Sequence, residues 1–341
     1  MNWTKKVVAL CLLVGGLWTI ADALADDLPD MGEPPPAQMK AETHANAAEY
    51  LNRDAVCTKC HDESETRPVL SVFATKHGVK GDSRTPTCQS CHGESEAHVK
   101  NAEGKATRPA PDVLFGVRSS SYSSFARTEA ATQNQSCMKC HNNAGGKRNF
   151  WSGSQHQTRD IPCAACHTTH AKQDDVLTKA TQPEVCFACH KDQRSQSNQY
   201  SHHPIQEGKV VCSDCHNPHG SSGPKLLKKN TVNETCFTCH AEKRGPFLWE
   251  HRPVTENCTN CHNPHGSNFQ PLLKSRPPFL CQECHNGPHN SKTPAGQNVG
   301  GYQNGLPKTV NASTQATARG CNNCHVMIHG SNHPAGAFLH R

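Results

Sequence analysis

Apolar residues are concentrated near the N-terminus, and no later part of the chain has a comparable run. Residues 7–20 are almost all apolar, two lysines precede them, and an Ala-Leu-Ala sequence follows. A stretch of about 14 residues is short for a membrane-spanning helix, which needs about 20. Leu10, before Cys11, is also not the small residue that a lipoprotein signal requires. The pattern therefore predicts a cleaved export signal over residues 1–25, in preference to a membrane anchor or a lipoprotein signal.

The rest of the chain is too polar to build an ordinary core. Hydrophobic residues make up 34% of the sequence, a figure that includes 21 cysteines, and aromatic residues only 5%. A chain of this length normally buries a much larger apolar core. We expect a mostly coil fold with short α-helices, little or no β-sheet, and prosthetic groups in place of the core. Residues 26–56 form a Pro-rich N-terminal extension.

A Cys-x-x-Cys-His motif occurs ten times and uses 20 of the 21 cysteines. On a helical turn this spacing places both thiols and the imidazole close together, as covalent attachment of a c-type haem requires. Zinc sites and disulfide frameworks do not need a histidine after every pair. The motif therefore predicts ten covalent haems, held by Cys57, Cys60, Cys88, Cys91, Cys137, Cys140, Cys163, Cys166, Cys186, Cys189, Cys212, Cys215, Cys236, Cys239, Cys258, Cys261, Cys281, Cys284, Cys321 and Cys324, with proximal iron ligands His61, His92, His141, His167, His190, His216, His240, His262, His285 and His325.

The motifs recur in pairs, which indicates a tandem repeat. "CFACHKDQRSQSNQYSHHPIQEGKVVCSDCHNPHGS" is followed by "CFTCHAEKRGPFLWEHRPVTENCTNCHNPHGS", and the segment from Cys137 has the same layout. Stacked repeats of this kind form elongated arrays. We expect residues 57–341 to form one elongated multihaem cytochrome c domain, a haem wire of five two-haem modules with approximate bounds 57–136, 137–185, 186–235, 236–280 and 281–341.

Fourteen histidines lie outside the motifs, and two recur at similar places in each module. Their recurrence gives ten candidates for the second ligand of ten irons, and iron held by two histidines favours electron transfer over substrate binding. Two assignments stay open, namely His203 or His202, and His329 or His333. The predicted distal ligands are His77, His98, His156, His170, His203, His219, His251, His265, His289 and His329, and the surplus histidines are His44, His202, His333 and His340.

Chain reach limits which iron some of these histidines can bind. Two histidines on opposite faces of one haem need Cα atoms about 12 Å apart. Three residues span at most about 10 to 11 Å, so His265 cannot complete the haem of His262. The same limit applies to His219 and His170, whereas His98 lies far enough from His92 to escape it. The histidine after the motif is thus expected to join neighbouring haems.

Charge argues against a nucleic-acid partner. The formal net charge is +6, and loss of the export signal leaves +5. Ten haems would add twenty propionates and bring the mature protein near −15. A surface of this sign repels phosphate backbones.

The ten motifs, the NPHGS copies, "CHAEKRGPFLWEHRPVTENC" and the ending "VMIHGSNHPAGAFLHR" resemble the MtrA/DmsE family of decahaem cytochromes, which includes MtoA and PioA. The resemblance covers nearly the whole mature chain. It implies a periplasmic protein at the outer membrane that threads an outer-membrane β-barrel porin of the MtrB type. It also implies periplasmic or inner-membrane cytochromes as partners, often with a surface multihaem cytochrome at the exterior.

The expected function is electron transfer between the periplasm and the cell exterior, without a substrate site of its own. Outward transfer would serve metal-oxide reduction and inward transfer Fe(II) oxidation, and the sequence leaves both open. Two alternatives are a multihaem periplasmic reductase with one open haem site and a soluble periplasmic electron shuttle. A reductase would need an exchangeable iron site, whereas every motif here is the ordinary CxxCH.

Overall fold

The computed structural model describes residues 45–62, 64, 69–78, 84–101, 108–117, 126–141, 150–285, 321–334 and 336–340. The chain divides into residues 1–45 and residues 46–341, and the account below concerns the second unit. The predicted export signal and most of the predicted N-terminal extension lie outside the described residues. No described helix has the length and apolar character needed to cross a membrane.

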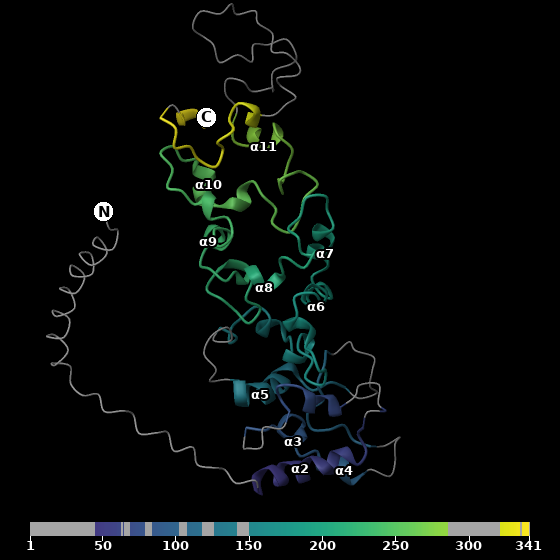
Figure 1. The fold of residues 1–341 in the computed structure, drawn as a ribbon. Coiled ribbons are helices and arrows are strands. Elements are labelled where there is room, and N and C mark those ends of the chain that lie inside the picture. The colour runs from purple at the N-terminus through teal and green to yellow at the C-terminus, as the bar shows by residue number, and fades with distance from the viewer. Residues whose placement is uncertain are drawn as a thin grey trace, which may run out of the picture. The chain divides into compact units, whose positions relative to one another are not determined.

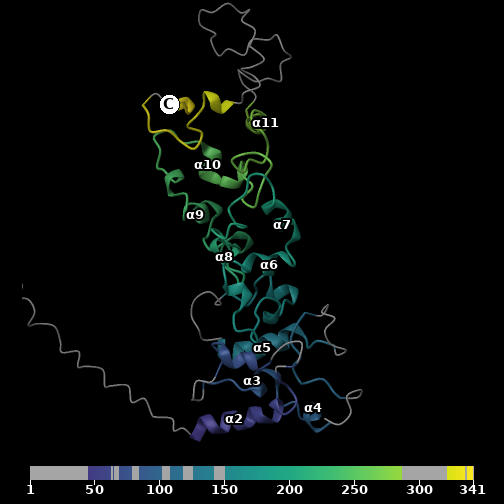
Figure 2. The same ribbon diagram turned by 45° about the vertical axis from the view of Figure 1, so that its right-hand side comes forward.

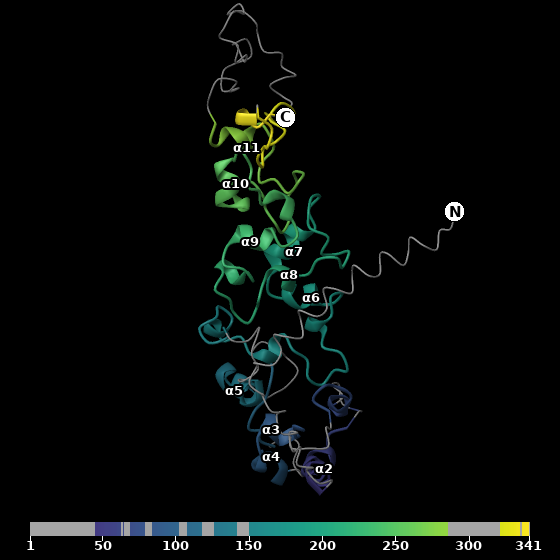
Figure 3. The same cartoon turned by 60° about the vertical axis from the view of Figure 1, so that its left-hand side comes forward.

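Short helices follow one another in chain order through this second unit, with coil between them (Figures 1 and 2). Figure 3 shows the same helices from a third side. The α-helices are α2 (Ala45–Thr58), α3 (Cys88–His92), α4 (Glu96–Lys100), α5 (Ala130–His141), α6 (Gln182–Phe187), α7 (Lys191–Ser197), α8 (Cys212–Cys215), α9 (Val232–Cys236), α10 (Arg252–Glu256) and α11 (Phe279–Gln282). The 3-10 helices are η3 (Leu70–Ala74), η4 (Gln157–Arg159), η5 (Cys163–Ala165), η6 (Asp175–Leu177), η7 (Pro224–Leu226), η8 (Ala241–Lys243), η9 (Cys258–Asn260), η10 (Cys321–Asn323) and η11 (Gly336–Phe338).

Each haem motif forms a single helical turn or closes a helix. In the Cys212 motif, the N–H of His216 donates to the carbonyl of Cys212 at 3.0 Å. The same bond joins His262 to Cys258 at 3.1 Å. A turn of this kind brings residues i, i+3 and i+4 to one side of the backbone. The two thiols and the imidazole of a motif are therefore presented together, as the spacing predicts.

Few apolar side chains are buried, and the described residues contain no β-strand. The buried apolar residues among them are Val113, Phe187 and Val211. Isolated β-bridges, such as the one between Ser201 and Ser267, replace a sheet. The expectation of a coil-rich multihaem cytochrome with short helices and little or no sheet is confirmed.

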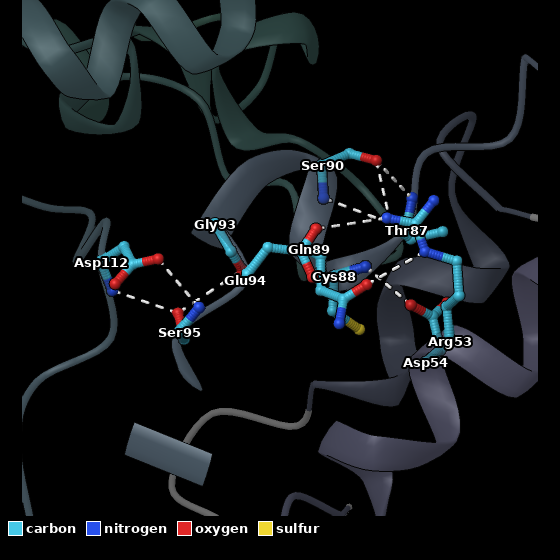
Figure 4. A network of polar contacts seen from close by, with 10 residues as sticks. All are labelled: Arg53, Asp54, Thr87, Cys88, Gln89, Ser90, Gly93, Glu94, Ser95 and Asp112. Atoms are coloured by element: carbon cyan, nitrogen blue, oxygen red, sulfur yellow. Dashed lines mark hydrogen bonds and ion pairs between the residues drawn. The ribbon is translucent and has the colours of Figure 1, made fainter. Parts of the chain in front are cut away.

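A buried polar side chain joins the two motifs of the first module. Asp54 of α2 is 5% exposed, and its carboxylate accepts from the backbone N–H of Cys88 at 2.8 Å. Figure 4 shows this contact beside the capping box in which Thr87 and Ser90 satisfy each other's backbone N–H groups at the start of α3. The N-terminal end of α3 is thus held against α2, and with it the first thiol of the second motif.

In later repeats, neutral buried side chains likewise accept a hydrogen bond from a backbone N–H of the second motif. Asn134 accepts from the N–H of Cys163 at 2.7 Å, and Asn233 accepts from the N–H of Cys258 at 2.7 Å. Gln182 accepts from the N–H of Ser213 at 2.9 Å. All three side chains are at most 8% exposed. Each lies three or four residues before the first cysteine of the module whose second motif it contacts, a regularity in the sequence that could have indicated a shared role.

Candidate haem-binding sites

The first cysteines of paired motifs lie in contact. A hydrogen bond links the thiols of Cys186 and Cys212 and lowers the pKa of Cys212 to about 7. The Cys236 thiol has the same effect on Cys258, whose pKa also falls to about 7. Equivalent thiol contacts occur within the other motif pairs, namely Cys57 with Cys88, Cys137 with Cys163, and Cys281 with Cys321. These contacts join the motifs that the repeat pattern groups into modules.

Second cysteines lie near the following pair of motifs. Burial raises the pKa of Cys166, and the nearby thiol of Cys189 raises it further. Other cysteines influence one another in the same way from one motif pair to the next, namely Cys91 with Cys137 and Cys140, Cys215 with Cys239, and Cys261 with Cys284. The attachment cysteines are therefore close to the next motif at every step along the described chain.

Imidazole rings meet in pairs, each made of a motif histidine and a histidine from outside the motifs. In nine pairs the ring centroids lie 5.9–6.3 Å apart. The pairs are His61 with His98, His92 with His170, His141 with His77, His167 with His219, His190 with His156, His216 with His265, His240 with His203, His262 with His329, and His285 with His251.

This separation fits an iron between two imidazoles. Two metal–nitrogen bonds of about 2 Å, with the distance from each ring centre to its nitrogen, place the centroids about 6 Å apart. Direct ring stacking would bring them closer, and unrelated rings would show no common value. The residues present therefore fit a c-type haem that is attached through a motif and ligated from both faces.

Chain reach agrees with the observed partners of the histidines that follow a motif. The His265 ring pairs with His216 instead of His262, and the His219 ring pairs with His167. His98, for which reach sets no limit, pairs with His61 and not with His92. Apart from the His61–His98 pair, every one of these ring pairs joins neighbouring modules, and two pairs cross each junction.

The two open assignments show distinct environments. The His203 ring faces His240, whereas the Nδ1 of His202 lies 2.6 Å from the carbonyl of Gln199. The His329 ring faces His262, whereas the backbone carbonyl of His333 accepts from the indole of Trp249 at 3.0 Å.

The last motif differs from the others. The His325 ring lies 4.4 Å from that of His340, which is too short for an iron between them. His340 is not among the predicted ligands, and no feature of the sequence pattern places it near His325. The predicted ligand His289 lies outside the described residues, as does the surplus His44.

Burial favours the neutral form of several paired histidines. Desolvation lowers the pKa of His92, His216 and His262 among the motif histidines. It also lowers the pKa of His265 and His329 among their partners. Neutral imidazole is the form that binds a metal ion, so burial prepares these rings for ligation.

Backbone carbonyls orient many of the rings. The Nδ1 of His156 donates to the carbonyl of Pro218 at 2.8 Å, and that of His203 donates to Pro264 at 2.7 Å. These prolines directly precede His219 and His265 in the NPHGS copies. A bond at Nδ1 leaves Nε2 free for a metal. One Pro-His dipeptide therefore supplies a ring to one pair and orients a ring of another.

Comparisons with known proteins show which family the chain belongs to. The doubled CXXCH motif model matches residues 202–245 and 251–294, and the NrfB-like cytochrome c-type protein model matches residues 88–182. The chain is 42% identical over 314 residues to the multihaem cytochrome MtrA of Shewanella baltica, covering 90% of this chain and 87% of that protein. The chain belongs to the MtrA family of multihaem cytochromes. It is also 32% identical over 133 residues to the cytochrome c-type protein NrfB of Haemophilus influenzae, covering 35% of this chain and 55% of that protein.

Membership of this family confirms the resemblance seen in the sequence. The CxxCH motifs hold covalent c-type haems, and the protein is a multihaem electron-transfer cytochrome. Haem supplies a reversible one-electron couple, and the chain supplies its attachment, axial ligands and surroundings.

Proposed function

We propose that this cytochrome carries ten bis-histidine haems in a continuous series and conducts electrons through an outer-membrane porin between the periplasm and the cell exterior. The observation that carries the proposal is a series that passes through every motif from Cys57 to Cys321, in which thiols are in contact within each motif pair and cysteines of successive pairs lie close enough to influence each other's pKa. A series of this kind gives each inner haem two neighbours and leaves the haems of the first and last motifs as its ends.

The contacts alternate between two kinds, which supports a linear order. First cysteines meet within a module, as Cys186 and Cys212 do. Second cysteines approach the next module, as Cys215 and Cys239 do. Haem order in space would therefore follow motif order in the chain. Electrons would enter or leave at the motifs of Cys57 and Cys321, in either direction.

The paired histidines support electron transfer over substrate chemistry. An iron held on both faces by imidazole has no open position for a substrate. The nine ring pairs, with centroids 5.9–6.3 Å apart, support this coordination because they have the separation that an iron between two imidazoles requires. We propose that the distal ligands are the histidines of these pairs that lie outside the CxxCH motifs, together with His289 for the iron of the last motif.

The family resemblance supports the porin, the periplasmic location and the cytochrome partners. A polar chain that contains no described membrane-spanning helix could pass through a bilayer inside a water-filled barrel. The proposal includes a β-barrel of the MtrB type around the cytochrome, electron-exchange partners in the periplasm or inner membrane, and a surface multihaem cytochrome outside. The export signal over residues 1–25 would deliver the chain to the periplasm.

Transfer across liposomes tests the proposal. A reductant outside the vesicle should reduce an enclosed redox dye rapidly when the cytochrome and a MtrB-type barrel are reconstituted together. Vesicles with the cytochrome alone, and vesicles with the barrel alone, should reduce the dye slowly. Retention of a second, non-redox dye controls for leakage. Equally fast reduction without the barrel would contradict the porin requirement, whereas equally slow reduction with the barrel would favour the soluble shuttle.

Spin state tests the closed coordination. We expect the oxidised protein to show only low-spin bis-histidine haems by EPR and near-infrared magnetic circular dichroism. One high-spin haem per chain would contradict the proposal and support the reductase alternative. The motif of Cys321 would then be the first to examine, because His325 lies too close to His340 for an iron between their rings.

A further inference from the structure

The side chain that orients His167 is charged. The Nδ1 of His167 lies 2.7 Å from Oδ2 of Asp174. The other carboxylate oxygen, Oδ1, accepts from the backbone N–H of Thr168 at 3.2 Å. Both side chains are partly buried, with 32% of His167 and 16% of Asp174 exposed. The carboxylate is therefore held by two donors in a position where water screens it only partly.

The corresponding histidines of the next two modules meet neutral acceptors. The Nδ1 of His216 donates to the carbonyl of Lys225 at 2.9 Å, and that of His262 donates to the carbonyl of Pro271 at 2.8 Å. All three histidines close the second motif of their module. The repeat therefore provides two internal references in which the geometry of the bond is similar and the negative charge is absent.

The field of Asp174 also reaches the attachment site. Burial is the main cause of the raised pKa of Cys166, and the charge of Asp174 contributes to it. Asp174 thus lies near two of the three side chains through which this motif would hold its haem. Negative charge close to an iron stabilises the oxidised state, which carries one more positive charge.

We propose that Asp174 tunes the haem of the Cys163 motif. By accepting a charge-assisted hydrogen bond from His167, it makes this imidazole a stronger electron donor and lowers the reduction potential of the haem below those of the Cys212 and Cys258 motifs. The inference rests on the haem assignment in the proposed function. Asp174 acts through His167 and does not touch the iron. The Cys163 motif would then form an energetic step within the series, which slows transfer in both directions.

Potentiometry of the full-length, haem-loaded protein tests this role. In Asp174→Asn the side chain can still accept from His167, but the charge is lost. Charge-assisted hydrogen bonds are roughly twice as strong as neutral ones, so we expect the oxidised-to-reduced ratio of one haem to fall about tenfold at a given potential. A tenfold change equals about 59 mV for a one-electron couple. About one tenth of the haem absorbance should therefore move to higher potential, since one haem in ten is affected.

Asp175→Asn is the matched control. It removes the same charge from the adjacent residue, which lies outside the His167 contact. The redox titration of Asp175→Asn should overlay that of the unmodified protein. Asp174→Glu, which keeps the negative charge, should retain most of the lowering of the potential. The EPR g-values of one haem should also change in Asp174→Asn. If that variant fails to load ten haems, the neutral Asp174→Ser variant takes its place.

Two failures can be distinguished. Identical titrations of Asp174→Asn and Asp175→Asn, both with ten low-spin haems, would overturn the tuning role and leave the proposed function intact. An unmodified protein with fewer haems or a high-spin site would contradict the proposed function itself.

Discussion

The loops that follow the Cys163 and Cys212 motifs occupy equivalent places in the repeat, but they supply different hydrogen-bond acceptors to the motif histidine. After His216, the chain runs through the NPHGS sequence and returns the carbonyl of Lys225 to the imidazole. After His167, the sequence is TTHAK, and a carboxylate from Asp174 takes the place of that carbonyl. In both loops the histidine three residues later pairs with the preceding module, as His219 does with His167 and His170 does with His92.

The two loops also pack differently. Gly220 has a φ of +115°, and a Cβ built on it would lie 2.1 Å from the carbonyl oxygen of Phe150. Ala171 takes the corresponding place in the other loop and is not among the residues with positive φ. Ring pairing is therefore common to the repeats, whereas backbone conformation and local charge differ between them. Substitutions at His219, Asp174, Gly220 and Ala171 test this distinction, and one at Asn233 tests a buried amide outside the two loops.

Removal of a histidine that pairs with the motif histidine of a neighbouring module should leave one iron without its second axial ligand. In His219→Ala, we expect one of the ten haems to become high-spin, because the His167 ring loses its partner. EPR spin quantification gives the measurement. His202→Ala, which removes a histidine bonded to Gln199 and Glu207, should leave all haems low-spin.

A second substitution identifies the opened haem. Adding Asp174→Asn to His219→Ala should shift the potential of the high-spin haem, because Asp174 contacts His167. If Asp174→Asn shifts the potential of a low-spin haem and leaves that of the high-spin haem unchanged, the high-spin haem belongs to another motif and the pairing of His219 with His167 is wrong.

Adding a Cβ atom at Gly220 should destabilise the protein. Gly220→Ala combines left-handed strain with overlap against the Phe150 backbone, at a combined cost of about 3 kcal/mol in the free energy of unfolding. The guanidinium midpoint, followed by far-UV circular dichroism, measures this loss.

Gly208 provides the control. Its φ is +66°, and a Cβ added there would have no other atom within 4 Å, so Gly208→Ala should cost only the conformational strain of about 1 kcal/mol. Equal losses in the two variants would show that close packing at Gly220 contributes nothing.

Loss of the buried side-chain amide of Asn233 should lower the stability of the protein. The side chain of Asn233 accepts from the N–H of Cys258 and donates to the carbonyls of Val254 and Thr255. Asn233→Ala removes the side-chain partner of these partly buried backbone groups, which should lower the free energy of unfolding by about 2 kcal/mol. Denaturant titration gives the measurement. Asn230→Ala, at an exposed position, should change it little, and similar losses in both would argue against the role of the buried amide.

The smallest effect is expected at Ala171. Ala171→Gly adds backbone freedom to the unfolded chain and should cost about 0.5–1 kcal/mol, with haem content unchanged. The guanidinium midpoint again provides the measurement. An increase in stability would show that Ala171 is strained in the folded chain and would remove the difference between the two loops.

The sequence alone determined the local chemistry of the sites. Spacings of three and four residues specify one helical turn, so the attachment cysteines and motif histidines were predictable from short range alone. Chain reach also excluded certain partners, such as His265 for the iron of His262. The coil-rich fold followed from the shortage of apolar residues, because the prosthetic groups take the place of a core.

The tertiary structure decided which rings meet and what surrounds them. The Nδ1 of His170 donates to the carbonyl of Val69, 101 residues away, and the His262 ring faces His329. Such contacts depend on how successive modules pack, which no local spacing encodes. The same holds for the second partner of each imidazole. Lys225 contributes its backbone carbonyl and Asp174 its side chain, so only the folded loops distinguish a neutral contact from a charged one.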